Sequence, residues 1–316
     1  MNQALHEATV EPPPKVAASV AASSRSLWLG WAIALGSTLA FSFATPIAKG
    51  IILLGTDPTT LLVLRLGITT ALLFGTILFS EPNRLKIDRR GLALCIAAGC
   101  SNGVGMLSYF WSLTRVDASI AAMIFSVSPL VVLCLLALRG EKFTGRNILR
   151  LGLGLIGVYL LIGPGGQVDL WGAALASVSV FTVPFQLVIM QWFLGDYDSR
   201  TVTLYMVATM TMMAGGLWLI EGRTWVNPSW LGWALILAMA FVTTYIARLL
   251  LFLSINKIGG GQTGLLAPLE TLFTVVWSIL FLGERLAPVQ WLGSGFIVLS
   301  AALVVERLRW ARDEKN

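Results

Sequence analysis

Gly140-Glu141-Lys142, followed by Gly152-Leu153-Gly154, has a second copy in the chain: Gly283-Glu284-Arg285, followed by Gly293-Ser294-Gly295. The two copies lie 143 residues apart at the first motif and 141 at the second. In a chain of 316 residues, this spacing divides nearly the whole sequence into two units of similar length. We therefore predict an internal repeat.

The composition is typical of an integral membrane protein. Hydrophobic residues make up 56% of the chain and charged residues 12%, and the mean hydropathy is +0.80. A soluble domain carries about 25% charged residues. Most of the apolar runs are near the ~20 residues that a helix needs to cross ~30 Å of hydrocarbon. We predict ten transmembrane helices, over residues 27–54, 59–80, 91–113, 118–138, 148–163, 170–194, 201–220, 229–255, 262–282 and 289–305.

The distribution of basic residues predicts the orientation. With a cytoplasmic N-terminus, sixteen Lys and Arg residues fall in inner segments and three in outer loops, which agrees with the positive-inside rule. Both termini are then cytoplasmic, and we expect a bacterial-type plasma (inner) membrane. Each unit holds five runs, an odd number, so the second unit must be inverted relative to the first.

The predicted fold is an all-α membrane protein with two five-helix repeats of inverted topology around a central cavity. We assign residues 27–163 to the first repeat and 164–306 to the second. Residues 1–26, with Pro12-Pro13-Pro14, are predicted to be a disordered cytoplasmic tail, and 307–316 a basic cytoplasmic tail. Inverted repeats build a site near the bilayer midplane, which predicts a carrier.

The motifs resemble a known family. Ser128-Pro129-Leu130 precedes the first Gly-Glu motif, and Leu269-Glu270-Thr271 precedes the second. This pattern resembles the drug/metabolite transporter superfamily in its ten-helix EamA-type branch, and within it bacterial aromatic amino-acid exporters. The resemblance implies a secondary transporter that exports small amphipathic metabolites, amino acids and aromatic ones included, by alternating access. Family members often carry Glu-Pro in the ninth helix, whereas this chain has Glu270-Thr271.

The sequence lacks the residues that several other functions require. The chain has no phosphate-binding Gly-x-x-x-x-Gly-Lys-Ser/Thr loop, and its one histidine, His6, lies in the N-terminal tail. Its three cysteines have no metal-ligand spacing. We expect no enzymatic activity, cofactor, metal or nucleic-acid partner, and a monomer in the lipid bilayer that binds a small-molecule substrate. Two alternatives stay open: export of other metabolites or drugs, and a lipid-handling or sensory protein without solute flux.

Polar residues at membrane depth are the candidate site. A zwitterion needs a cationic or N–H-rich partner for its carboxylate, which Lys49 or Asn102 would supply. Its ammonium needs an acceptor or an aromatic face, which Glu270 or Tyr245 would supply. The predicted substrate-binding residues are Lys49, Asn102, Tyr109, Thr244, Tyr245 and Glu270, in a cavity between the first, third, fourth, sixth, eighth and ninth helices.

Charge and proline mark the remaining candidates. Counted from Gln262, Glu270 lies about 12 Å into the hydrocarbon, where an acid is a functional candidate and would make transport depend on pH. Arg65 and Arg248 are expected to be shallow, with their side chains reaching the headgroups. Hinge or cavity roles are predicted for four prolines that interrupt helices, with packing kinks as the alternative: Pro46, Pro129, Pro184 and Pro268.

Overall fold

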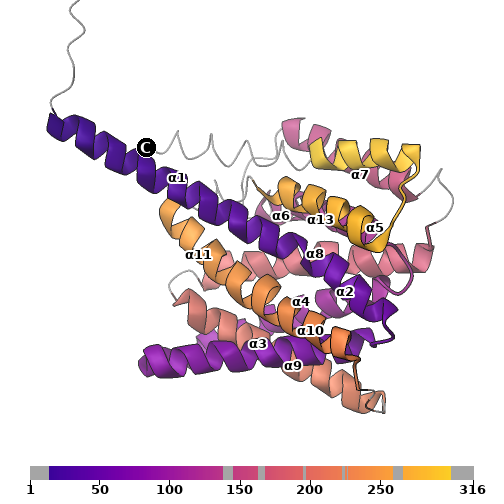
Figure 1. The fold of residues 1–316 in the computed structure, drawn as a ribbon, viewed down its shortest axis with the longest axis horizontal. Coiled ribbons are helices and arrows are strands. Elements are labelled where there is room, and N and C mark those ends of the chain that lie inside the picture. Colours follow the sequence, from indigo (N-terminus) through magenta and orange to yellow (C-terminus); the bar gives the residue numbers. More distant parts are fainter. Residues whose placement is uncertain are drawn as a thin grey trace, which may run out of the picture.

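The computed structural model describes residues 14–137, 145–162, 168–194, 197–222, 225, 227–258 and 266–299. Every regular element in these ranges is helical. A last helix, Pro288–Leu299, carries no label in Figure 1. The labelled elements are α1 (Pro14–Ser42), α2 (Ala44–Leu53), α3 (Pro58–Ser80), η1 (Pro82–Leu85), α4 (Arg89–Ser112), α5 (Ala118–Phe125), α6 (Ser128–Ala137), α7 (Gly145–Ile162), α8 (Leu170–Phe193), α9 (Ser199–Ile220), α10 (Trp230–Ala238), η2 (Met239–Ile246), α11 (Ala247–Ile258) and α13 (Ala267–Leu282).

Much of this helical structure suits a bilayer. In the described ranges, six helices are long and apolar enough to cross a membrane, and three shorter ones are apolar. The six are Trp28–Leu53, Pro58–Ser80, Arg89–Ser112, Leu170–Met190, Arg200–Ile220 and Trp230–Leu251. The multi-pass, all-helical character is thus present, while the count of ten transmembrane helices stays a prediction.

The first helix begins earlier than the sequence analysis expects. We predict disorder over residues 1–26, but α1 starts at Pro14, so the prediction is wrong for the stretch from Pro14 onward. The physical reason is local: four alanines between Pro14 and Ser23 favour helix, and proline is well suited to the first turn, where no N–H is needed. Residues 1–13 and 307–316 lie outside the described ranges.

Two pairs of helices, with one member of each pair in each half, begin with matching capping residues. Asp57 caps α3 by accepting from the N–H groups of Thr59 and Thr60, and Asp198 caps α9 by accepting from those of Arg200 and Thr201. The two caps lie 141 residues apart. The same spacing separates the caps of α4 and α10, where Asp88 accepts from Gly91 N and Ser229 from Gly232 N. These capping bonds satisfy N–H groups that have no partner inside the helix.

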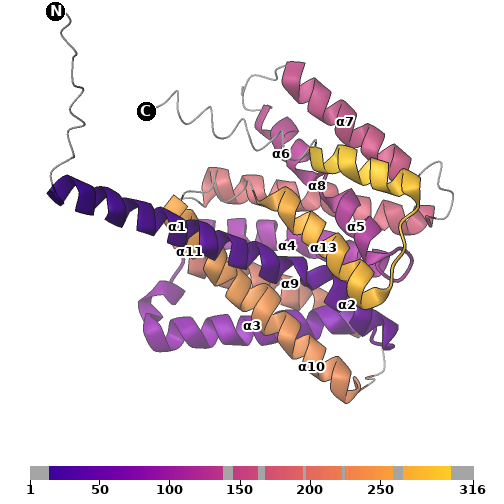
Figure 2. The same ribbon diagram turned by 45° about the horizontal axis from the view of Figure 1, so that its top comes forward.

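Helices from different halves pack against one another. Figures 1 and 2 show α3 next to α9 and α1 next to α11, and α4 packs against both α8 and α9. At the α3–α9 contact the hydroxyls of Thr70 and Thr211 are 3.0 Å apart, and these residues are themselves separated by 141 positions. A residue of α3 therefore contacts the residue at the corresponding position of α9.

Small residues permit close approach at other contacts. Gly157 of α7 faces the helix Pro288–Leu299, where an added Cβ would lie 2.8 Å from the Gly293 carbonyl. On α4, Gly99 packs against Thr209 and Gly105 against Thr182, with no room for a Cβ at either position. The first Gly-Glu motif, Gly140-Glu141-Lys142, lies outside the described ranges.

The prolines act in different ways. The α1–α2 helix breaks at Phe43, because Pro46 has no N–H to donate to the Ser42 carbonyl. The Thr274 hydroxyl of α13 donates a hydrogen bond to this carbonyl, Ser42 O, over 3.1 Å and so replaces the missing backbone donor. Pro184 lies inside α8, which stays continuous.

Pro129 and Pro268 lie in the first turns of α6 and α13, where a missing N–H costs nothing. Pro184 therefore does not break α8, and the residues before Pro268, 259–265, lie outside the described ranges, so the hinge and cavity roles of the four prolines stay predictions. For Pro129, α5 ends at Phe125 and α6 begins at Ser128, so the fourth apolar run is broken there.

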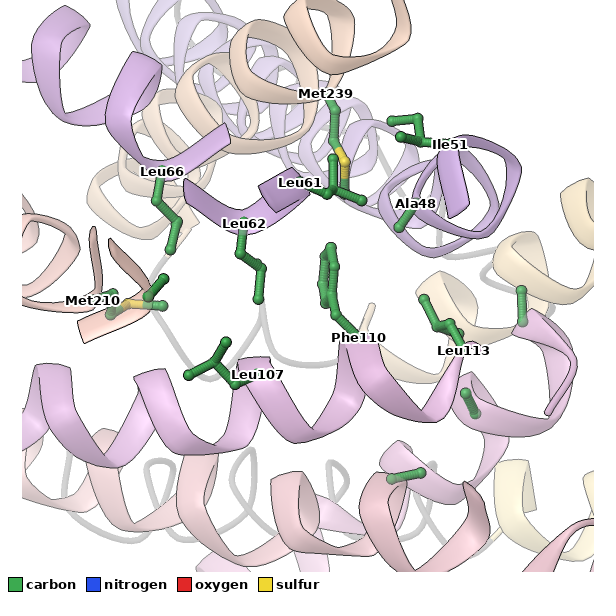
Figure 3. Close-up of a cluster of buried hydrophobic side chains, with 14 of the residues drawn as sticks. Ala48, Ile51, Leu61, Leu62, Leu66, Leu107, Phe110, Leu113, Met210 and Met239 are labelled. Atoms are coloured by element: carbon green, nitrogen blue, oxygen red, sulfur yellow. The ribbon is translucent and has the colours of Figure 1, made fainter. Parts of the chain in front are cut away.

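A hydrophobic core supports the middle of the molecule. Figure 3 shows Leu62 of α3, Leu107 and Phe110 of α4 and Met210 of α9 pointing toward one another, with Met239 of η2 above them. All of these side chains are buried. By contrast, large apolar side chains such as Phe79, Met212 and Ile220 are exposed on the outside, as expected for a surface in contact with lipid. This core holds α3, α4 and η2 against the cavity described next.

Candidate functional site: a central polar cavity

A cavity of about 170 Å³ lies between the helices of the two halves. It is lined from α1, α2, α3, α4, α5, α8, η2, α11 and α13. These include all the segments that the sequence analysis expects around the site, with α3 in addition. The lining residues are Phe41, Ala44, Thr45, Arg65, Leu66, Asn102, Gly105, Met106, Tyr109, Phe110, Phe125, Ser179, Val183, Thr243, Thr244, Arg248 and Glu270.

Four of the six predicted substrate-binding residues meet in this cavity: Asn102, Tyr109, Thr244 and Glu270. Asn102 is buried, 5% exposed, on the face of α4 that also carries Tyr109 two turns later. The Tyr109 and Thr45 hydroxyls are 3.1 Å apart. Phe125 meets the Tyr109 ring edge-on, with the ring centroids 5.8 Å apart. The cavity therefore offers both hydroxyl and amide groups and aromatic surface.

A π-helical segment brings the eighth apolar run to the cavity. Over Met239–Ile246 the helix widens to η2, and such π segments are frequent at functional sites. The Thr243 hydroxyl donates to Met239 O over 2.7 Å, and the Thr244 hydroxyl lies 3.4 Å from the same carbonyl. Thr243 lies 141 positions after Asn102, so corresponding positions of the two halves both line the cavity.

Two arginines that sequence reasoning assigned to the headgroups line the cavity instead. Arg65 is 5% exposed, its Nε donates to Thr244 Oγ1 over 2.9 Å, and its guanidinium carbon lies 5.5 Å from the centre of the Phe110 ring. Arg248 lies on the first turn of α11, directly after η2. The expectation that their side chains reach the headgroups is wrong. The distance of a residue from the end of an apolar run gives its depth in the membrane, but it does not give the face of the helix on which the side chain lies.

Glu270 lies at the start of its helix. Residues 259–265 are outside the described ranges, and α13 begins at Ala267 with Glu270 in its first turn. The positive end of the helix dipole is therefore close to the carboxylate and favours its negative charge. The Thr274 hydroxyl, which donates to Ser42 O, also lies 2.9 Å from Glu270 O. This contact ties the Glu270 turn to the break between α1 and α2.

Lys49 and Tyr245 do not line the cavity. Lys49 Nζ donates to Leu113 O over 2.7 Å and to Val116 O over 2.9 Å, so it closes the end of α4. The Tyr245 hydroxyl lies 2.8 Å from Thr76 Oγ1, and its ring stacks on Phe241 with centroids 5.9 Å apart. Both residues hold neighbouring helices together.

The described residues offer no group of three His, Cys, Asp or Glu side chains that could hold a metal ion. The cavity instead combines two guanidinium groups, a carboxylate, hydroxyls and aromatic rings. Such a set suits reversible, non-covalent binding of a polar solute.

Comparison with known proteins assigns the family. Residues 28–163 and, separately, residues 170–306 match the EamA-like transporter family. The chain belongs to the EamA-like transporter family. The expected membership of the drug/metabolite transporter superfamily is thereby confirmed, and the family is one of transporters.

Relatives of this EamA-like protein are transporters as well. It is 26% identical over 283 residues to the Threonine/homoserine exporter RhtA of Escherichia coli K12, covering 87% of this chain and 90% of the relative. It is 25% identical over 242 residues to an uncharacterized transporter of Archaeoglobus fulgidus, covering 77% and 87%. One solved crystal structure superposes with a TM-score of 0.59 at 18% identity, covering 91% of this chain and 99% of that one, which shows a shared fold.

Proposed function

We propose that this EamA-like protein is a secondary transporter that exports small amphipathic metabolites, amino acids with aromatic ones among them, by alternating access of its central cavity. The observation that carries the proposal is the cavity itself. It lies between helices of both halves, and its lining holds charges of both signs. The similarity to a threonine/homoserine exporter supports amino acids as the substrate class.

The size of the cavity favours small metabolites over drugs. Pockets for drug-sized ligands span roughly 300–1,000 Å³, whereas this cavity has about 170 Å³. Threonine and homoserine are small enough to suit such a volume, and an aromatic amino acid would need the helices to move apart. Export of larger drugs is therefore the less favoured alternative.

Alternating access by two inverted repeats is the proposed mechanism. Two separate matches to one family support two homologous halves. The contact between Thr70 and Thr211 supports a two-fold relation, since a residue touches its own counterpart only close to a two-fold axis. Rocking of one half against the other would then expose the cavity to each side in turn.

The orientation proposed from the basic residues completes this mechanism. Both termini lie in the cytoplasm of a bacterial-type cell, and the chain works as a monomer in the inner membrane. Asn102, Tyr109 and Thr244 then face the solute at the middle of the membrane. Flexing at the Phe43 break would change how α1 and α2 close over it.

Flux in proteoliposomes tests the function. Purified protein is reconstituted with unlabelled threonine inside, and uptake of labelled threonine is measured as counterflow, with homoserine and phenylalanine as further substrates. Protein-dependent counterflow of at least one amino acid is expected. A protein that only senses or handles lipids gives none, and that result would rule out the proposal.

A further inference from the structure

The cavity has an unbalanced set of charges. Arg65 and Arg248 line it together with a single acidic residue, Glu270. Within the described ranges, the ion pairs involve surface residues, and none includes any of these three side chains. The arginine charge therefore stays available for a ligand.

Arg65 is already positioned. Its Nε donates to Thr244 Oγ1 on the π-helical segment, and its guanidinium lies over Phe110. A guanidinium has five N–H donors, and this hydrogen bond uses one of them. The buried side chain thus presents its remaining donors in a fixed plane.

Arg248 supplies the group that most needs a partner. Its Nε is buried and has no hydrogen-bond partner among the described residues. A buried donor without a partner is destabilising, and arginine does not relieve this by losing its proton. An anion with two oxygens in one plane satisfies a guanidinium best, because it accepts two parallel hydrogen bonds.

We infer that Arg248, with Arg65 beside it, binds the carboxylate of the transported solute. The inference rests on the proposed transport function and narrows its substrate class to carboxylates. Glu270 adds a negative charge to the same cavity, so a solute with an ammonium group next to its carboxylate, an α-amino acid, is favoured further. Cationic drugs without a carboxylate are poor substrates, because the two arginines that line the cavity repel them.

The test compares solutes that differ only in one charged group. Binding of threonine to the purified protein is followed by isothermal titration calorimetry, alongside threoninol, which lacks the carboxylate, and 3-hydroxybutyrate, which lacks the ammonium. We expect threoninol to bind about 10–100-fold more weakly than threonine, the range for loss of a charged hydrogen-bonded contact. Glycerol 3-phosphate serves as the competing anion.

Variants locate the contact. In Arg248→Gln the preference for threonine over threoninol should disappear, and Arg248→Lys should retain part of it, since lysine keeps the charge without the planar fork. Arg200→Gln, on the exposed start of α9, is the matched control and should keep the full preference. Because the readout is a ratio of two affinities, a variant with a lower folded yield still reports on it.

The outcomes separate the two proposals. Equal binding of threonine and threoninol by the unmodified protein overturns the carboxylate site and leaves amino-acid export standing. Binding of 3-hydroxybutyrate without any amino-acid counterflow supports the carboxylate site and removes amino-acid export. Stronger binding of glycerol 3-phosphate than of every carboxylate overturns the inference in favour of a phosphate site.

Discussion

Replacing Glu284 by alanine should destabilise the protein, because this residue caps a helix of the other half. α5 begins at Ala118, and the side chain of its own capping position, Asp117, makes no capping bond. Glu284, in the loop after α13, accepts from Ala118 N over 2.7 Å, from Ser119 N over 2.9 Å and from Ser119 Oγ over 2.5 Å. The second Gly-Glu motif therefore links the end of α13 to the start of α5.

The size of the effect follows from these three bonds. Loss of a helix cap costs about 0.5–2 kcal/mol, and hydrogen bonds to a charged group contribute about 1.5–3 kcal/mol each. Glu284 is only half-buried, so water will replace part of the loss, and we expect about 2–4 kcal/mol for Glu284→Ala. Ser119→Ala removes only the hydroxyl bond and should cost about 1 kcal/mol.

Thermal unfolding of the detergent-solubilised protein measures the effect. At roughly 2 °C per kcal/mol for a chain of this size, Glu284→Ala should lower the midpoint by about 4–8 °C and Ser119→Ala by about 2 °C. All midpoints are compared at one heating rate, since unfolding of such proteins is commonly irreversible. The neighbouring exposed residue supplies the control, Arg285→Gln. If Glu284→Ala and Arg285→Gln shift the midpoint equally, the capping argument is refuted.

Three further predictions concern the site and the topology. Asn102→Leu should lower threonine counterflow at least tenfold, because it removes the amide from the cavity lining, whereas Tyr245→Phe, outside the lining, should keep it; equal loss in both variants contradicts this placement. Glu270→Gln should change the pH profile of counterflow, since it keeps the shape and removes the charge, and an unaltered profile and rate would make Glu270 structural. Single cysteines introduced on a background without the native cysteines should be labelled from the cytoplasm at 142–146 and from outside at 285–288, and labelling of 285–288 from inside would disprove the inverted repeat.

Helix starts and membrane character were accessible from the sequence because they depend on local chemistry. Asp57 followed by Pro58 is typical of the start of a helix, here α3, and Asp198 caps α9 in the same way. Both caps act over two or three residues and need no tertiary partner. The start of α1 at Pro14 differs from the prediction because the proline run indicates disorder, whereas the alanines that follow it favour helix.

The charged part of the site could not be predicted in the same way. Arg65 and Arg248 are about two helical turns from the ends of their apolar runs, and snorkelling and burial are both possible at that depth. The choice depends on how each helix is rotated, which packing decides: α3 turns Arg65 toward Thr244 because η2 lies against that face. The π-helical segment rotates the residues after it relative to a regular helix, so the face of Arg248 could not be read from α-helical periodicity.

Arg65 and Arg248 also explain how a symmetric scaffold can bind an asymmetric solute. Positions 141 residues away from them hold Met206 and Leu107, both buried apolar residues. The two halves therefore supply matched polar positions, Asn102 and Thr243, whereas each half supplies one arginine that has no cationic counterpart in the other half. A carboxylate has one charged end, and a cavity with two-fold symmetric charges would bind it equally well in two orientations. Because the arginines break the symmetry, the inferred site would hold the solute in a single orientation throughout the alternating access proposed above.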